Sequence, residues 1–280
     1  MSAHIIAVTN QKGGVAKTTT AINLSQALVL NGLAVLLVDL DPQGNATQGI
    51  GVELNTIKLS VADLILNKEV SAAEVVYQGD GLDLIPATPI LARAEREMVG
   101  MTNSELRLGH RLNQLREKYE VVLIDTPPTL GPLMNSALNA ADSLIVPVDS
   151  SYFAMMGIKE LLSEVGEIRQ GTNQRLRILG YLLTMADQTR ISAETWDGLI
   201  AGFGEAVFET KIRRSVKLKE APAYGRTVFH HAPESAGAED YSALANEVIG
   251  RIRVDLPNAE IRLENGTRRP LGVPNDQAPR

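Results

Sequence analysis

Short, nearly uninterrupted apolar runs recur along the chain and alternate with longer segments of helical periodicity. The runs predict six buried strands, at residues 4–9, 34–39, 82–86, 120–125, 143–148 and 176–183. Helical patterns occupy the intervals near 18–31, 104–118, 132–140, 154–170, 191–203 and 238–253. Continuous apolar strands separated by helices indicate an α/β fold, with a mostly parallel, twisted sheet and helices on both faces.

No break in composition marks a second domain, and 280 residues are enough for one large α/β domain. We therefore predict a single domain over residues 1–253. From about Val254 the periodic pattern fades into sequence that contains Pro, Asn and Arg. We predict that residues 254–280 form a flexible C-terminal tail.

Residues 10–19, Asn-Gln-Lys-Gly-Gly-Val-Ala-Lys-Thr-Thr, lie between the first predicted strand and the first predicted helix. Backbone N–H groups of such a loop and of the helix start can surround a phosphate. Lys17 would reach the terminal phosphates, and the Thr18 hydroxyl would hold Mg²⁺. The loop departs from the pattern G-x-x-x-x-G-K-[ST], because Ala16 replaces the glycine before the lysine and Asn10 stands at the first position.

Acidic residues follow two of the predicted strands, at the sheet edge where ligands bind in open α/β folds. Asp39 and Asp41 end the second strand and point to the same side, and Asp125 ends the fourth. We expect Asp125 to hold Mg²⁺ through water, Asp39 to support the Mg²⁺ shell, and Asp41 to orient or activate an attacking water. Capping of the following helices would explain one of these acids but not all three.

The phosphate loop and the segment Asp-Leu-Asp-Pro-Gln-Gly-Asn-Ala-Thr at 39–47 resemble the ParA/Soj-type partition ATPases of the ParA/MinD family, whose P-loop is deviant. The resemblance spans residues 4–253 and includes 207–222, 235–241 and 244–247. It implies a P-loop NTPase fold and a Mg²⁺-dependent ATPase that is slow without its partner, with ATP and Mg²⁺ as cofactors. It also implies that nucleotide contacts come from Lys12, Gly13, Gly14, Val15, Ala16, Lys17, Thr18 and Thr19.

The second lysine of the loop, Lys12, is the feature that separates this family from other P-loop proteins. The resemblance implies an ATP-dependent sandwich homodimer in which Lys12 reaches the phosphates of the other subunit, as an arginine finger does. The expected catalytic set is then Lys12, Lys17 and Asp41. The segments after Asp41 and Asp125 would be switches that sense the γ-phosphate.

Residues 211–226 form a basic cluster of six cations with one acid, Glu220, in a chain of net charge −6. Such a cluster predicts contact with phosphate backbones, and the resemblance implies binding of double-stranded DNA without sequence preference in the ATP state. A solvated helix face is the alternative interpretation. The candidate DNA-binding residues are Lys211, Arg213, Arg214, Lys217, Lys219 and, upstream, Arg190.

Two positions of this region depart from the family pattern. Arg213 stands where the family commonly has a proline that lies near the nucleotide base, so its candidate roles are adenine stacking, DNA contact, or neither. The family often places an arginine at the position of Thr189, whereas here Arg190 comes one residue later.

Composition excludes several rival classes. The chain has no cysteine, so disulfides and the iron–sulfur reductases of this fold are excluded. No apolar run approaches the length of a membrane span, and residues 265–272 are too broken by Gly and Pro for a MinD-like membrane helix. Because the loop begins about ten residues in, we expect no signal peptide and no N-terminal helix-turn-helix domain. We expect a cytoplasmic, nucleoid-associated protein with no membrane partner.

These observations predict an ATPase whose cycle positions or segregates a cargo over the nucleoid, either a chromosome or plasmid or a protein body. A ParB-like protein or another cargo adaptor would stimulate hydrolysis. The alternative is a nucleotide-gated scaffold that binds a partner protein and for which DNA and turnover matter little.

Overall fold

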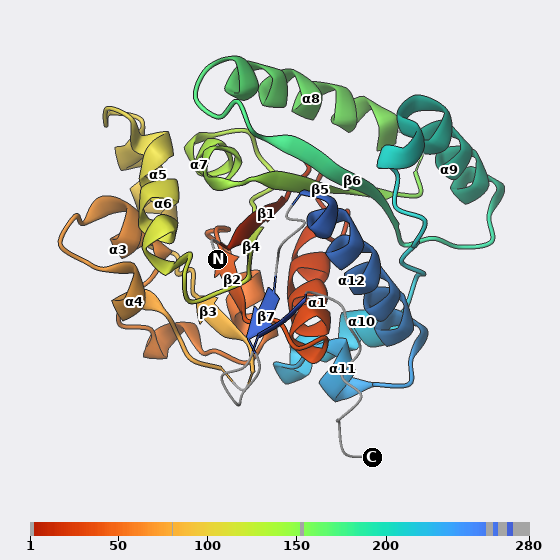
Figure 1. Cartoon of the computed structure of the whole chain (residues 1–280), viewed down its shortest axis with the longest axis horizontal. Coiled ribbons are helices and arrows are strands. Elements are labelled where there is room, and N and C mark those ends of the chain that lie inside the picture. Colours follow the sequence, from red (N-terminus) through yellow and green to blue (C-terminus); the bar gives the residue numbers. More distant parts are fainter. Residues whose placement is uncertain (1–2, 80, 152–153, 256–259, 263–267, 271–280) are drawn as a thin grey trace.

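A six-stranded, entirely parallel sheet forms the centre of the computed structural model, which describes residues 3–79, 81–151, 154–255, 260–262 and 268–270 (Figure 1). The strand order is β3-β2-β4-β1-β5-β6. The bounds are β1 (His4–Val8), β2 (Val35–Asp39), β3 (Asp83–Ile85), β4 (Val121–Asp125), β5 (Ser143–Asp149) and β6 (Arg177–Thr184). The six predicted strands and the α/β fold are confirmed.

Helices cover both faces because successive residues of each strand point to opposite sides. In β1, Ile5 and Ala7 belong to one buried core, and Ile6 and Val8 belong to the other. The first core is completed by α3 (Val61–Leu66), α4 (Ala72–Val75), α5 (Leu91–Met98), α6 (Ser104–Leu112), α7 (Pro132–Ala140), α8 (Ala154–Gln170) and α9 (Arg190–Phe203). The second is completed by α1 (Lys17–Leu30), α2 (Asn45–Gly49), α10 (Val216–Glu220), α11 (Val228–His231) and α12 (Ala236–Asp255).

The predicted long helices are present, whereas the short ones were not predicted. The helices α2, α3, α4, α10 and α11 have at most six residues, too few to establish a helical period. The same holds for the 3₁₀ turns η1 (Leu54–Thr56), η2 (Asn113–Leu115), η3 (Gly204–Ala206) and η4 (Ala221–Tyr224). The short helix α2 and the turn η4 nevertheless prove important for the site.

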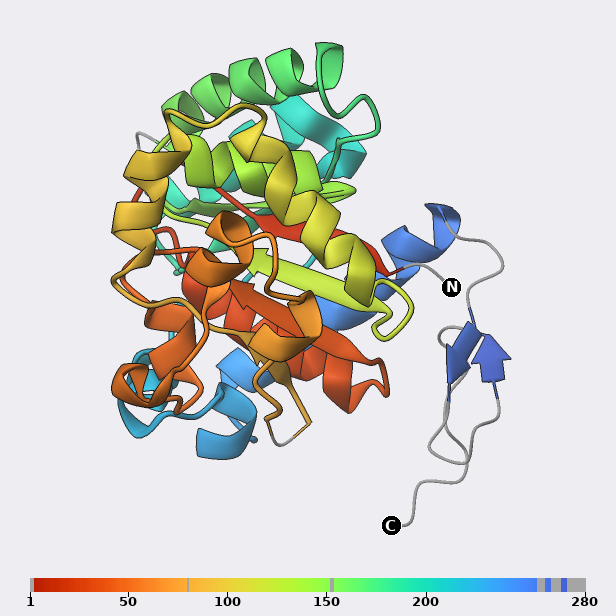
Figure 2. The same ribbon diagram turned by 90° about the vertical axis from the view of Figure 1, so that its left-hand side faces the viewer.

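The C-terminal segment contains more regular structure than its sequence pattern indicates. Helix α12 continues through residue 253 to Asp255, and β7 (Glu260–Arg262) pairs antiparallel with β8 (Arg268–Pro270), outside the main sheet (Figure 2). The other residues of the predicted tail 254–280 lie outside the described residues. No helix in the described part of the chain is long and apolar enough to cross a membrane.

Candidate nucleotide-binding site

The loop of residues 9–16 joins β1 to α1, and side chains tie it to the neighbouring strands. The Asn10 amide donates to the carbonyl oxygen of Pro147 in β5 at 2.7 Å. The Thr184 hydroxyl of β6 donates to the carbonyl oxygen of Val15 at 3.1 Å. These bonds hold both halves of the loop, so its N–H groups are arranged before a ligand binds.

Ala16 immediately precedes α1 and adopts a left-handed backbone, with φ 63° and ψ 33°. This conformation costs a non-glycine residue about 1 kcal/mol, which explains why the common pattern has glycine at this position. The Ala16 carbonyl oxygen accepts the Thr20 N–H at 2.9 Å and so begins the helix. Ala16 therefore preserves the loop geometry at the cost of local strain.

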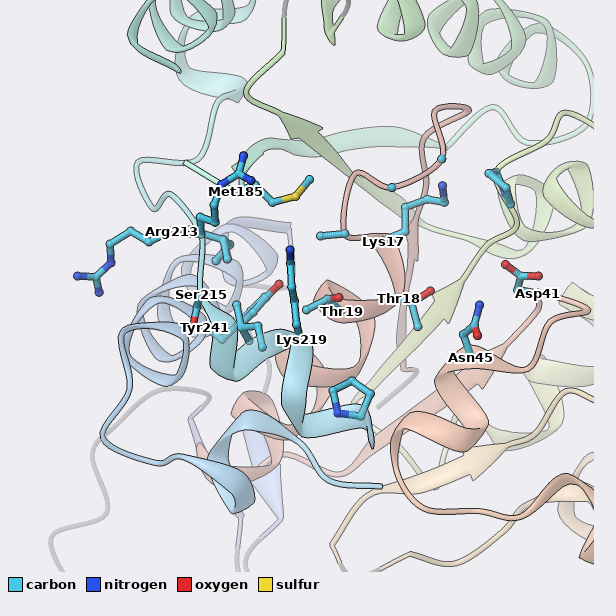
Figure 3. Close-up of a pocket in the computed structure, with 18 of the residues that line it drawn as sticks. Lys17, Thr18, Thr19, Asp41, Asn45, Met185, Arg213, Ser215, Lys219 and Tyr241 are labelled. Atoms are coloured by element: carbon cyan, nitrogen blue, oxygen red, sulfur yellow. The ribbon is translucent and has the colours of Figure 1, made fainter. Parts of the chain in front are cut away.

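A cavity of about 570 Å³ opens beside the loop (Figure 3). Such a volume lies within the usual range for small-molecule sites. In Figure 3, Lys17, Thr18 and Asp41 lie toward one side of it, and Met185 and Tyr241 lie toward the other, where Arg213 and Lys219 also lie. A side next to the phosphate loop and a side with apolar and aromatic surface fit the phosphates and the base of a nucleotide.

The cavity brings together most of the predicted nucleotide contacts. The predicted residues that line it are Gly13, Gly14, Ala16, Lys17, Thr18, Thr19 and Arg213. Val15 is buried behind the loop, and the side chain of Lys12 points elsewhere. Asp39 and Asp125 are fully buried behind the cavity wall.

Lys17 is a buried cation whose ammonium group donates to the carbonyl oxygen of Lys12 at 3.0 Å. Burial lowers its pKa, and the nearby carboxylates of Asp125 and Asp41 raise it. A phosphate in the cavity would offer Lys17 a charged acceptor in place of a carbonyl oxygen.

Asp125 carries the strongest indication of a missing cationic partner. The register of β2 and β4 sets it opposite Asp39. Burial raises the pKa of Asp125 well above its usual range, and the charge of Asp39 raises it further, whereas the Thr18 hydroxyl and Lys17 lower it. The Thr18 hydroxyl is near enough to affect this pKa but is not aligned for a hydrogen bond, so neither carboxylate oxygen of Asp125 has a well-formed hydrogen bond among the described residues.

A Mg²⁺ ion with its bound waters fits this environment, because it would neutralise buried carboxylate charge and satisfy the orphan oxygens. Within the described residues no three His, Asp or Glu side chains are grouped to hold a metal on their own. Mg²⁺ in P-loop sites needs no such group, since phosphate oxygens and water supply most ligands. Thr18 and Asp125 are the side chains that would hold it.

Asp39 uses its carboxylate to organise the loop that follows β2. One oxygen accepts the Thr47 N–H at 2.8 Å and the Thr47 hydroxyl at 2.7 Å, and the other accepts the Asp41 N–H at 3.1 Å. Burial raises the pKa of Asp39 to about 6, against the effect of these hydrogen bonds. Its predicted support of the Mg²⁺ shell would therefore act through this loop.

Asp41 lies at the cavity wall, where its Oδ1 accepts the N–H of Gln43 at 2.9 Å. Figure 3 shows Asp41 beside Asn45 on the side of the cavity that holds Thr18. Asn45 and Thr47 have no predicted role, although both belong to the quoted 39–47 segment. Thr47 comes eight residues after Asp39 in the sequence, and only the fold brings its hydroxyl to that carboxylate.

Lys12 is held within its own subunit. Its ammonium group donates to both carboxylate oxygens of Asp149, at 2.7 and 2.8 Å, and to the Ser151 hydroxyl at 2.6 Å. It does not line the cavity. To reach a nucleotide in a second subunit, Lys12 would have to exchange these three bonds for phosphate contacts.

Arg213 is engaged by carboxylates of α12. Its guanidinium donates to Asp240 at 2.6 Å and also to Glu239, and its backbone N–H donates to Asp240 at 2.8 Å. Hydrogen bonds to these two acids raise its pKa. Because its charge is offset, Arg213 is better suited to anchoring its segment against α12 than to binding DNA or adenine.

The other predicted DNA contacts differ in whether their cationic groups already have a partner. The ammonium of Lys211 lies 3.6 Å from the centre of the Trp196 ring. Lys217 pairs with Glu220 at 2.8 Å, and Arg190 pairs with Glu194 at 2.7 Å. Lys219 has no carboxylate partner among the described residues and points from α10 into the cavity (Figure 3).

The fold reduces the charge of the 211–226 cluster. Three acids from outside it, Asp187, Glu239 and Asp240, contact Arg213 or Arg214. The cluster then has six cations against four acids, where the sequence alone gives six against one. Charges distant in sequence cannot be assigned to a surface without the fold.

The base end of the cavity was largely missed from the sequence. Met185 follows β6 with a left-handed backbone, φ 51°, and lies opposite Tyr241 of α12 in the cavity (Figure 3). The end of β6 is the carboxyl end of a parallel strand, which was a usable signal for Met185. Tyr241 carried none, because it comes from a helix that begins far along the chain.

A parallel sheet with a phosphate loop after its first strand and acids after β2 and β4 defines a P-loop nucleotide triphosphatase. Comparison with known proteins agrees. A family model described as an AAA domain matches residues 3–178. The solved structure of cobyrinic acid a,c-diamide synthase from Mycobacterium smegmatis, with a bound ATP analogue and magnesium, superposes with a TM-score of 0.78 at 32% identity, covering 97% of this chain and 100% of that one.

Sequence relatives narrow the class. The chain is 47% identical over 249 residues to the chromosome-partitioning ATPase Soj of Thermus thermophilus, covering 89% of this chain and 96% of the relative. It is 42% identical over 247 residues to the sporulation initiation inhibitor protein Soj of Bacillus subtilis, covering 87% and 97%. The chain belongs to the ParA/Soj family of P-loop ATPases. The resemblance stated from the sequence is thus confirmed, and so are ATP and Mg²⁺ as the family's cofactors.

Proposed function

We propose that this protein is a partition ATPase that dimerises with ATP, binds DNA without sequence preference in that state, and releases it after hydrolysis. One observation carries the proposal. The segment 211–226 forms a wall of the nucleotide cavity through Arg214 and Lys219, while Lys217 and Arg226 are exposed and do not line the cavity. A ligand in the cavity and a phosphate backbone outside would therefore contact the same segment.

Each step has a residue that can perform it. Lys17 would bind the terminal phosphates. Thr18 and Asp125 would hold Mg²⁺, which would supply charge neutralisation at the phosphoryl group. Asp41 orients the attacking water. Lys12 leaves Asp149 and offsets phosphoryl charge in the other subunit, so hydrolysis depends on dimerisation.

One relative supports a role in moving a cargo. The chromosome-partitioning ATPase Soj of Thermus thermophilus is similar to this chain over nearly its whole length. We infer a cytoplasmic, nucleoid-associated protein that segregates DNA or positions a protein body, with a ParB-like or other adaptor that stimulates hydrolysis. A nucleotide-gated scaffold without DNA binding is the alternative that the following experiment separates.

The test is co-sedimentation with plasmid DNA in the presence of ATP, of ADP, and without nucleotide. We expect binding with ATP alone, and loss of that binding when Lys217→Glu and Arg226→Glu are combined, because neither residue lines the nucleotide cavity. Arg93→Glu is a suitable control, because Arg93 is exposed on α5 and also pairs with a glutamate. DNA binding that is the same with ATP, with ADP and without nucleotide contradicts the proposal. DNA binding by the double variant equal to that of the wild type contradicts it too. An absence of DNA binding combined with ATP-dependent partner binding favours the scaffold.

A further inference from the structure

The short helix α2 ends in a glycine-centred turn next to the site. The N–H of Val52 donates to the carbonyl oxygen of Thr47 at 3.2 Å, and the N–H of Gly51 donates to that of Gln48 at 2.9 Å. This pair of bonds is the Schellman motif, in which the glycine takes a left-handed backbone. Gly51 accordingly has φ +89°.

The turn η4, inside the basic cluster, ends in the same motif. The N–H of Arg226 donates to the carbonyl oxygen of Ala221 at 3.2 Å, and the N–H of Gly225 donates to that of Pro222 at 3.0 Å. Gly225 has φ +61°. The cation Arg226 is thus fixed relative to this glycine by the motif itself.

The two glycines are in direct contact, backbone against backbone. A methyl group added to Gly225 would lie 2.6 Å from the Cα of Gly51, and one added to Gly51 would lie 2.9 Å from the carbonyl oxygen of Gly225. Real side-chain carbons do not approach so closely. No side chain fits between the two turns, so a displacement of one cannot be absorbed by rotamer changes in the other.

The middle residue of α2, Thr47, is attached to the nucleotide site. The Thr47 hydroxyl donates to Asp39 at 2.7 Å and accepts the N–H of Ala87 at 3.0 Å. Asp39 also holds the N–H of Asp41. The loop that carries Asp41 and the helix α2 are therefore organised by one carboxylate, and α2 ends on the basic cluster.

We propose that α2 and η4 link the nucleotide site to the DNA-binding surface, with the Thr47 side chain as the attachment to the site and the Gly51–Gly225 contact as the junction to η4. This inference rests on the proposed function. A change in the Asp41 loop on ATP binding moves α2, and the incompressible glycine contact moves η4 with Arg226. The link makes DNA affinity follow nucleotide state through this contact as well as through dimerisation.

The test compares two glycine-to-alanine variants that share the backbone penalty. Gly225→Ala places a methyl group against Gly51. Gly32→Ala is the control, because Gly32 has φ +83° in the exposed Schellman turn that ends α1. For each variant the dissociation constants for a DNA duplex are measured with ATP and with ADP, and dimerisation is followed by sedimentation. We expect the ratio of the dissociation constant in ADP to that in ATP to fall about five-fold or more in Gly225→Ala only. We expect this variant to dimerise as the wild type does.

The inference is overturned if Gly225→Ala leaves the ratio of the two dissociation constants unchanged. It is also overturned if the ratio falls only because the variant no longer dimerises. The wild-type arm tests the proposed function separately, because that function fails if the wild-type ratio is one. Hydrogen exchange in the wild type needs no variant. We expect Mg-ATP to alter exchange in residues 45–52 and 221–226 together. A change in 45–52 alone overturns the inference even if Gly225→Ala does not fold.

Discussion

Asp41 is the carboxylate that meets the cavity while Asp39 and Asp125 stay fully buried. We predict that Asp41→Ala retains ATP binding and dimerisation but slows phosphate release about 100-fold or more, the usual effect of losing a group that positions or deprotonates water. Asp63→Ala is the matched control, because Asp63 caps α3 through Ser60 far from the site and should affect only stability. Normal phosphate release from Asp41→Ala would refute the assignment.

His4 gives a prediction at the opposite end of the sheet. It is buried in β1 with its Nε2 2.8 Å from the Ser143 hydroxyl, and burial lowers its pKa to about 4 from the ordinary 6.5, against the charge of Asp142. As pH falls below 6.5, His4 takes up a proton in the unfolded chain, whereas in the folded protein it does so only near pH 4. The free energy of unfolding therefore decreases as pH falls across this window.

The change attributable to His4 amounts to roughly 3 kcal/mol of unfolding free energy between pH 7 and pH 4. Urea unfolding of the wild type and of His4→Gln at several pH values measures it. The variant keeps a polar partner for Ser143 but does not titrate, so its stability should fall less steeply. Parallel curves for the two proteins would show that His4 is not the cause.

At the scale of elements, β6 depends on a glycine that its apolar pattern does not explain. A methyl group on Gly180 would lie 2.3 Å from the ring of Phe208. We predict that Gly180→Ala destabilises the protein by about 1–3 kcal/mol, the typical cost of overpacking. Gly166→Ala, in α8 with no atom within 4 Å of the added methyl, should instead stabilise by roughly 0.5–1 kcal/mol. Thermal melts measure both effects. Melting temperatures that are both above or both below that of the wild type contradict this account.

The elements themselves were predictable where hydrophobic pattern decides them. Strands such as β1 and β4 are buried on both faces, so they are apolar apart from His4 at the start of β1 and Asp125 at the end of β4. Short elements were not predictable. Helix α2 is held by Asp39 through Thr47 and by a contact of the following Gly51 with Gly225, which lies more than 170 residues away in sequence. Tertiary contacts, not local propensity, maintain such helices.

At the scale of the molecule, the phosphate end of the site followed from the sequence and the base end did not. Lys17 and Thr18 begin the helix after β1 and the acids end or follow β2 and β4, so topology alone brings them together. The base end is built by residues from β6, η4 and α12, and the basic cluster receives acids from α12. These meetings depend on how helices pack, for which one sequence carries no direct signal.

Lys12 is the residue through which the nucleotide site would depend on the homodimer. Lys17 serves the cavity of its own subunit, while Lys12 is held by Asp149 and has no contact with that cavity. We predict that Lys12→Gln binds ATP within about two-fold of wild type but does not dimerise, since only the cation delivered between subunits is lost. Lys17→Gln should lose ATP binding itself, so titration with a fluorescent ATP analogue distinguishes the two lysines.

The central claim is that nucleotide state sets oligomeric state and thereby DNA affinity. Sedimentation velocity of the protein with a fluorescent DNA duplex measures both in one experiment. With Mg-ATP we expect wild-type dimers that sediment with the DNA, and with ADP we expect monomers that leave it free. Lys12→Gln should remain monomeric and unbound even with ATP. Monomers bound to DNA in ADP, or Lys12→Gln dimers that bind DNA as the wild type does, would contradict the account.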